Sequence, residues 1–238
     1  MTVDYKAMSL RLAEAVADQL RAKPASCLGL PTGRTPLGLY ETLAEWSRTG
    51  ALDWRAARCF ALDEYIDVPG EHSFACYLDS NIFRHTNLPE SARFNPLWVD
   101  DYDACIAAAG GLDLTIVGIG INGHIAFNEP GTPLASWTHC AWLTESTRRA
   151  NAPDFGGLEA VPSRAVTMGL TTIMSSRKVI LIASGQHKQG ILSRALTGPV
   201  TAAVPASYLQ VHPALTVLTD FGFEARWQPS RAVSRIQY

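Results

Sequence analysis

A histidine and a glutamate lie five residues apart in the stretch IVGIGINGHIAFNEPG, residues 116–131. His124 and Glu129 could do acid–base chemistry together, since a carboxylate can orient an imidazole and raise its pKa. The three glycines before the histidine permit a close backbone approach to a ligand or a positive φ. One alternative is a core histidine satisfied by a backbone carbonyl. A metal site is disfavoured because no clear third ligand lies nearby.

Two adjacent acids, Asp63 and Glu64, directly follow an apolar run that we expect to be a strand. Neighbouring side chains at the end of a strand point in different directions. One carboxylate could therefore act as a general base in a cleft while the other holds a structural partner. The alternative is a solvated acidic loop.

The segment PTGRTP, residues 31–36, lies between an expected strand and an expected helix. Threonine hydroxyls, backbone N–H groups next to a glycine, and the start of a helix together suit an anion such as phosphate. The candidate ligands in this segment are Thr32, Gly33, Arg34 and Thr35. A plain strand-to-helix turn is the alternative, and the ending GK[ST] of a P-loop is absent.

A fourth loop, SGQHK, contains Lys188 at the expected start of a helix that follows the most apolar run of the chain. A lysine in this position could bind a phosphate as a point charge. A solvated surface lysine is the alternative.

The elements that position these loops alternate between strand-like and helix-like segments. We expect strands over 25–30, 58–62, 112–118, 178–183 and 214–219, and helices over 8–20, 37–46, 73–83, 101–109 and 186–196. Continuously apolar strands separated by helices indicate an α/β fold with a mostly parallel, Rossmann-like sheet covered on both faces. Ligands of such sheets bind beyond the carboxyl ends of the strands, where all four loops fall.

No repeat or linker divides the chain, so we expect a single domain over residues 1–238. The segment 138–164 has a less regular pattern. It is predicted to be a mobile lid or an additional antiparallel layer.

The composition is that of an ordinary globular protein, with 238 residues, 47% hydrophobic and 18% charged, and a net charge of -2. It offers no basic run for nucleic acid and no apolar stretch near the ~18 residues of a membrane helix. Five scattered cysteines and the absence of a signal peptide predict reduced thiols and a cytoplasmic location. The expected partner is thus a small molecule.

The sequence resembles the glucosamine-6-phosphate deaminase (isomerase) family, whose superfamily includes 6-phosphogluconolactonase. The matching pieces follow the family's order and are LGLPTGRTP at 28–36, LDEY at 62–65, GIGINGHIAFNEP at 118–130, AVTMG at 165–169, and the segment 198–213. Lactonases keep the glycine and histidine of the third piece but lack its FNEP continuation. The resemblance therefore favours the deaminase branch.

This resemblance implies conversion of glucosamine 6-phosphate and water to fructose 6-phosphate and ammonium, in amino-sugar catabolism, without a cofactor or a metal. It assigns ring opening to His124, with Glu129 beside it, and proton transfer from C2 to C1 through an enolamine to Asp63. Asn122, the fourth expected catalytic residue, stands where some members carry an aspartate. The phosphate is expected at the loop 31–36 and at Lys188.

The sequence departs from the family in the segment TRRANAP, where Pro153 replaces an expected phosphate-binding arginine. Either Arg149 or Arg164 substitutes for it, or the substrate differs, with galactosamine 6-phosphate the nearest candidate. A second departure places His139 and Ala141 where allosteric members carry basic residues. We therefore expect no activation by N-acetylglucosamine 6-phosphate.

The relatively short chain favours a monomer or a small homo-oligomer over a hexamer. Besides the galacto epimer, two other functions stay open: a 6-phosphogluconolactonase and a non-catalytic sugar-phosphate sensor. The FNEP continuation argues against the lactonase. The presence of Asp63, His124 and Glu129 argues against the sensor.

Overall fold

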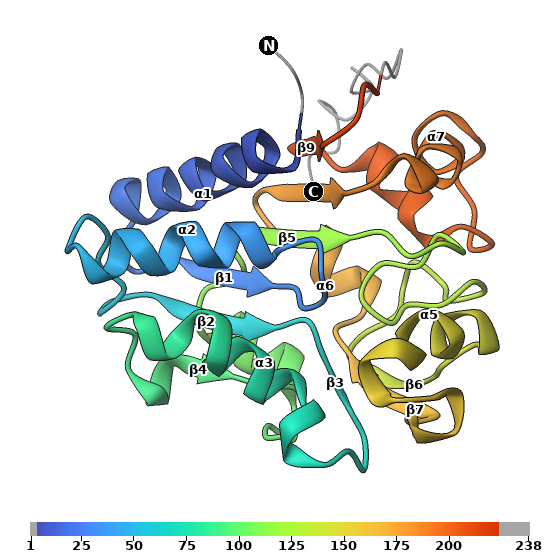
Figure 1. Ribbon diagram of the computed structural model, residues 1–238, viewed down its shortest axis with the longest axis horizontal. Coiled ribbons are helices and arrows are strands. Elements are labelled where there is room, and N and C mark those ends of the chain that lie inside the picture. The colour runs from blue at the N-terminus through green and yellow to red at the C-terminus, as the bar shows by residue number, and fades with distance from the viewer. Residues whose placement is uncertain (1–3, 224–238) are drawn as a thin grey trace.

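A six-stranded parallel sheet forms the centre of the protein in a computed structural model that describes residues 4–223 (Figure 1). Its strand order is β4-β2-β1-β5-β8-β9. The strands are β1 (Cys27–Leu30), β2 (Arg58–Ala61), β4 (Arg93–Phe94), β5 (Leu114–Gly118), β8 (Val179–Ala183) and β9 (Leu215–Thr219). The chain first adds β2 and β4 on one side of β1, and then adds β5, β8 and β9 on the other side of β1. The loops after β1 and β5 therefore diverge and leave a crevice between them.

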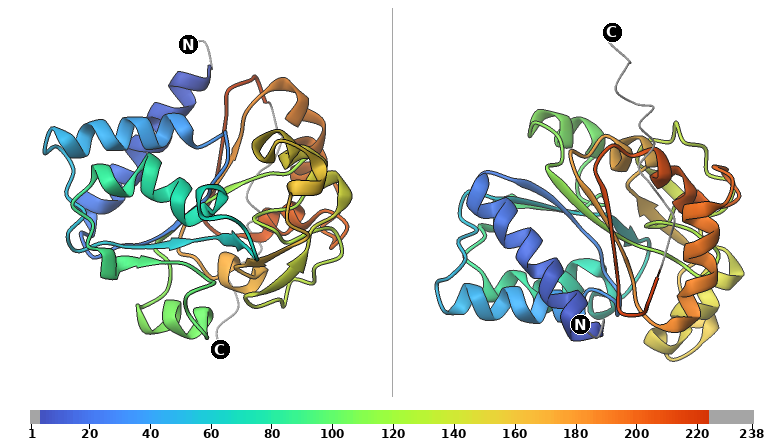
Figure 2. Two further views of the ribbon diagram at one scale, coloured as in Figure 1. Left: turned by 60° about the horizontal axis from the view of Figure 1, so that its bottom comes forward. Right: turned by 90° about the horizontal axis from the view of Figure 1, so that it is seen from above.

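Helices cover both faces of this sheet (Figure 2). One face carries α1 (Tyr5–Ala22), α2 (Leu37–Arg48) and α3 (Phe74–Asn81), and the other carries α4 (Tyr102–Ala108), α6 (Leu170–Met174) and α7 (Gln189–Thr197). Strand side chains alternate between the two cores: Ile180 packs with the first set of helices and Leu181 with the second. Burial on both faces explains why the strands are continuously apolar. The predicted α/β class is confirmed.

A second, antiparallel sheet of three strands lies beside the carboxyl ends of the first, in the order β3-β7-β6. Its strands are β3 (Asp63–Tyr65), β6 (His139–Trp142) and β7 (Arg164–Thr167), and α5 (Glu145–Phe155) connects the last two. An antiparallel layer is therefore present, but only β6 and the first residue of β7 lie within the segment 138–164, and movement of this segment as a lid stays a prediction. Only Leu62 separates β2 from β3, so the chain passes directly from one sheet into the other.

Most expected elements agree with the structure within a few residues. Ser73 caps α3 as predicted, since its Oγ accepts a hydrogen bond from Cys76 N at 3.1 Å. The helix expected over 186–196 begins instead with a 3₁₀ turn, Gln186–Lys188, before α7. Residues 1–3 and 224–238 of the predicted domain lie outside the described part of the chain. Across residues 4–223, every helix is too short or too polar to cross a membrane.

Candidate active site

A cavity of about 690 Å³ opens at the carboxyl ends of β1, β2 and β5. Its walls come from the loop 31–36, from Asp63, from the loop after β5, and from residues of α3 and α5. Seven of the nine predicted site residues line it: Thr32, Gly33, Arg34, Thr35, Asp63, His124 and Lys188. The four loops singled out by the sequence thus meet at one place.

The loop 31–36 presents unoccupied donors to this cavity. Within residues 4–223, the hydroxyls of Thr32 and Thr35 have no hydrogen-bond partner. Gly33 has a φ of 92°, and its carbonyl accepts a hydrogen bond from Tyr77 Oη at 2.5 Å. Helix α2 begins directly after the loop without a side-chain cap from Pro36, but its first two N–H groups are engaged: Leu37 N donates to Arg34 O and Gly38 N donates to Tyr5 Oη.

Lys188 approaches the cavity from the loop after β8. Its Nζ donates a hydrogen bond to the carbonyl of Ile119 at 2.8 Å, which fixes the ammonium group beside the loop that follows β5. Burial lowers the pKa of Lys188. An ammonium group has three donors, so two remain for a bound anion.

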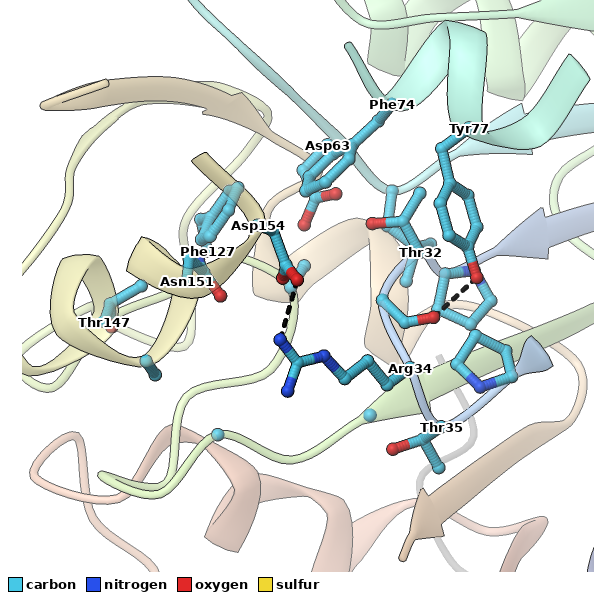
Figure 3. Close-up of a pocket in the computed structure, with 18 of the residues that line it drawn as sticks. Thr32, Arg34, Thr35, Asp63, Phe74, Tyr77, Phe127, Thr147, Asn151 and Asp154 are labelled. Carbon is cyan, nitrogen blue, oxygen red and sulfur yellow. Dashed lines mark hydrogen bonds and ion pairs between the residues drawn. The ribbon is translucent and has the colours of Figure 1, made fainter. Parts of the chain in front are cut away.

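Arg34 extends from the loop 31–36 toward α5, where its Nη2 pairs with Asp154 Oδ1 at 2.7 Å (Figure 3). The substitutes proposed from sequence for the missing arginine do not line the cavity. Arg149 pairs with Glu145 on the exposed side of α5, and Arg164 lies over the Trp142 ring. The guanidinium in the cavity is that of Arg34.

Asp63 lies at the joint between the two sheets, buried yet lining the cavity. Burial, together with the neighbouring charge of Glu64, raises the pKa of Asp63 to about 8. A carboxyl group with such a pKa is matched to proton transfer near neutral pH.

Glu64 points away from the cavity and holds structural partners, as the sequence suggested for one of the two acids. Its carboxylate accepts hydrogen bonds from Tyr65 N, Phe74 N, Ala75 N and Asn95 Nδ2, all at 2.8–2.9 Å. These bonds join the start of α3 to the strand that carries Asp63. Four hydrogen bonds thus fix Glu64, the neighbour of Asp63, in place.

His124 faces the cavity, with a hydrogen-bond network behind it. Its Nδ1 lies 3.2 Å from Thr147 Oγ1 and 3.5 Å from Glu129 Oε2. Asn122 Nδ2 donates to the same Glu129 oxygen at 2.7 Å. Burial alone would raise the pKa of Glu129, but His124, Thr147 and Asn122 lower it to about 2. Glu129 is therefore a fixed anion that orients the imidazole.

Asn122 and Glu129, both predicted as catalytic, do not line the cavity. Glu129 lies at Nδ1 of His124 and Asn122 donates to Glu129, so any part they take in the chemistry passes through the imidazole. Gly120 makes this arrangement possible, because a Cβ there would lie 2.3 Å from His124 Nε2. The imidazole packs directly against the glycine backbone.

Aromatic side chains that sequence reasoning missed form one wall of the cavity. Tyr65 packs against Phe74, Phe127 and Phe155 with ring centroids 4.6–5.3 Å apart, and His72 stacks on Phe155. Asn151 Nδ2 donates to Tyr65 Oη at 2.8 Å. The polar run TRRANAPD was a sequence signal for Asn151 and Asp154, whereas the scattered aromatic residues gave none.

The titratable groups of the cavity wall do not form a metal site: within residues 4–223, no three His, Cys, Asp or Glu side chains are arranged to hold an ion. The side chains instead provide anion donors on the loop 31–36 and, in the same cavity, a carboxyl and an imidazole. This combination can bind a phosphorylated small molecule and move protons on it.

Comparison with known proteins agrees with this geometry. The family described as glucosamine-6-phosphate isomerases/6-phosphogluconolactonase matches residues 4–218. A glucosamine-6-phosphate deaminase of Lachnoclostridium phytofermentans is 43% identical over 91% of this chain and 96% of its own. One of Clostridioides difficile is 40% identical over 95% of both chains.

Solved structures show the same relationship. A monomeric glucosamine-6-phosphate deaminase superposes with a TM-score of 0.87 at 37% identity, covering 90% of this chain and 93% of its own. The 6-phosphogluconolactonase of Trypanosoma brucei shares the fold at a TM-score of 0.73 and 18% identity. The superposition covers 92% of this chain and 94% of that one. The chain thus belongs to the family of glucosamine-6-phosphate isomerases and 6-phosphogluconolactonases.

Proposed function

We propose that this protein is a glucosamine-6-phosphate deaminase, which converts glucosamine 6-phosphate and water to fructose 6-phosphate and ammonium. The observation that carries the proposal is the placement of Asp63 and His124 in one cavity with unpaired phosphate donors. Relatives at about 40% identity over nine tenths of the chain bear this name, which supports it further.

The sugar phosphate enters with its phosphate at the loop 31–36. The hydroxyls of Thr32 and Thr35 and the cations of Arg34 and Lys188 bind it. This contact is remote from the reacting carbons. Its binding energy holds C1 and C2 in place for proton transfer.

His124 opens the pyranose ring by moving the proton between the O1 hydroxyl and the ring oxygen. Glu129 and Thr147 engage Nδ1, which leaves Nε2 for the sugar. Asn122 holds the shared Glu129 oxygen. In this scheme Asn122 and Glu129 are positioning residues for His124.

Asp63 carries the proton from C2 to C1 of the open sugar. Removal of the C2 proton gives an enolamine, and return of the proton to C1 leaves a C2 imine. Water adds to the imine and releases ammonium, so no electron acceptor is needed. Solvent exclusion around Asp63 keeps its pKa high enough for the carboxyl to return the proton.

The test is ammonium release from purified protein with glucosamine 6-phosphate and galactosamine 6-phosphate in parallel, beside hydrolysis of 6-phosphogluconolactone. We expect equal amounts of ammonium and fructose 6-phosphate from the gluco epimer. Release from the galacto epimer alone would shift the assignment to that substrate. Lactone hydrolysis without ammonium would overturn the deaminase.

We further propose that the protein acts in the cytoplasm as a monomer or small homo-oligomer, without nucleic acid or membrane partners. The five unpaired cysteines and the monomeric relative support this proposal. Light scattering after size-exclusion chromatography measures the oligomeric state, and a hexamer would contradict the proposal.

A further inference from the structure

The ion pair of Arg34 and Asp154 spans the mouth of the cavity. Arg34 comes from the loop after β1, and Asp154 comes from the last turn of α5, 120 residues later in the chain (Figure 3). Both residues line the cavity, and both side chains are more than half exposed. An ion pair this exposed contributes little to the stability of a fold.

The charges along the cavity wall indicate a different use for the pair. Among the described residues that line it, Arg34 and Lys188 are the permanent cations, and Lys188 already donates to Ile119 O. The Arg34 guanidinium has five N–H donors. Within the described residues, its one side-chain hydrogen bond runs from Nη2 to Asp154 Oδ1 at 2.7 Å. A phosphate dianion offers three acceptor oxygens and a larger charge than one carboxylate. A bound phosphate would therefore compete with Asp154 for the N–H donors of the Arg34 guanidinium.

We propose that Asp154 is a displaceable counter-ion that holds Arg34 over the cavity until the phosphate of the substrate takes its place. This inference rests on the proposed function and adds to it a residue that sets the affinity for phosphate. The Asp154 carboxylate keeps the guanidinium beside the unpaired hydroxyls of Thr32 and Thr35. When the substrate binds, its phosphate oxygens accept the hydrogen bond that Asp154 releases.

A structural latch between the loop and α5 is the competing explanation, and two substitutions separate it from the proposal. Arg34→Gln and Asp154→Asn break the same ion pair. If the pair only ties the loop to the helix, both variants must change substrate binding in the same direction. If Asp154 competes with phosphate for Arg34, they must change it in opposite directions.

We expect Arg34→Gln to raise the KM for glucosamine 6-phosphate about tenfold, since it removes a charge-assisted bond to phosphate. Asp154→Asn should lower KM about two- to fivefold, the range of an exposed ion pair. The kcat should stay close to that of the wild type in both. Arg34→Lys keeps the positive charge but lacks the paired N–H donors of a guanidinium, and it should recover part of the affinity that Arg34→Gln loses.

Matched controls lie on the same helix. Glu145 and Arg149 form an ion pair of similar exposure that does not line the cavity. Glu145→Gln and Arg149→Gln should leave KM unchanged, which separates a local effect of phosphate binding from a general effect of altered surface charge.

Calorimetric titration with inorganic phosphate tests the inference without turnover. The Kd for phosphate should rise in Arg34→Gln and fall in Asp154→Asn, even if the wild type released no ammonium and the proposed reaction had failed. A rise in both variants would establish the latch and overturn the proposal. An unchanged Kd in both would overturn it as well.

Discussion

At the end of the cavity formed by the loop 31–36, the hydroxyls of Thr32 and Thr35 have no partner within residues 4–223, and Arg34 is largely exposed. At the other end, His124 Nδ1 lies beside Thr147 Oγ1 and Glu129 Oε2, and Asn122 donates to the same Glu129 oxygen. One end consists of free donors on a loop, and the other consists of buried groups fixed to one another.

This difference corresponds to the two tasks of an enzyme that acts on a phosphorylated sugar. A phosphate tolerates small displacements because several donors share its charge, so a loop suffices to bind it. Proton transfer between carbons requires groups held to within a fraction of an ångström. We therefore expect substitutions at the buried end to lower kcat, and substitutions at the loop to raise KM.

The largest expected effect is that of Asp63→Asn. Loss of a positioned general base lowers rates by about 10²–10⁴-fold, and we expect kcat for ammonium release to fall within this range. KM should change little because Asp63 is proposed to act on C1 and C2 of the sugar, whereas the loop 31–36 binds the phosphate. Steady-state kinetics measure both, and a kcat within a few-fold of wild type would refute the role of Asp63 as the base.

Gly120→Ala tests whether the position of His124 matters as well as its presence. The new Cβ would lie 2.3 Å from His124 Nε2, so the imidazole must move. A displacement near 1 Å costs about 10²-fold in rate, which we expect in kcat. Gly190→Ala, where a Cβ meets nothing within 4 Å, is the control and should retain activity. Equal activity in the two variants would contradict the precise placement of His124.

A smaller effect is expected on the pH dependence when Glu64 is replaced by glutamine. Burial and the charge of Glu64 raise the pKa of Asp63 to about 8, so the wild-type kcat/KM should rise as the pH approaches 8 and the carboxylate forms. Glu64→Gln removes one of the two causes and lowers the pKa of Asp63. The rise should then occur at lower pH.

A pH–rate profile of kcat/KM measures this shift. Glu71→Gln is the control, because Glu71 lines the same cavity but is exposed, where solvent screens its charge. An unmoved profile in Glu64→Gln would show that another group limits the rate.

No effect is expected from N-acetylglucosamine 6-phosphate. His139 and Ala141 occupy β6, where allosteric members of the family are expected to carry basic residues. The velocity should depend hyperbolically on glucosamine 6-phosphate with or without the acetylated sugar. A sigmoidal curve that the acetylated sugar converts to a hyperbola would contradict this prediction.

The parallel sheet and its helices could be predicted because their strands are buried on both faces and therefore read as continuous apolar runs. The antiparallel sheet was harder to predict. Its strand β3 has three residues, Asp63–Tyr65, two of which are acidic, and β6 alternates without a strongly apolar face. Both strands exist because β7 pairs with them from a distant part of the chain.

The catalytic residues could be predicted in outline, because Asp63, His124 and Glu129 lie in short stretches next to strand ends. Their separation into cavity-lining and supporting residues could not, since it depends on where Thr147 in α5 packs against Nδ1. The pairing of Arg34 with Asp154 was equally hidden, because 120 residues separate the two partners. From the sequence, Arg149 and Arg164 were the expected substitutes for the phosphate-binding arginine that Pro153 replaces.

The division of the cavity wall into phosphate-binding and proton-transferring residues is the central claim, and one paired measurement tests it directly. Initial rates of ammonium release are measured over a range of glucosamine 6-phosphate for Thr32→Val and Asp63→Asn beside the wild type. Thr32→Val removes one unpaired hydroxyl at nearly constant shape.

We predict that Thr32→Val raises KM about tenfold with kcat preserved, because the lost hydrogen bond is made to phosphate before and during the reaction. Asp63→Asn should lower kcat with KM nearly preserved. The opposite pattern, with kcat lost in Thr32→Val or KM alone changed in Asp63→Asn, would contradict the claim.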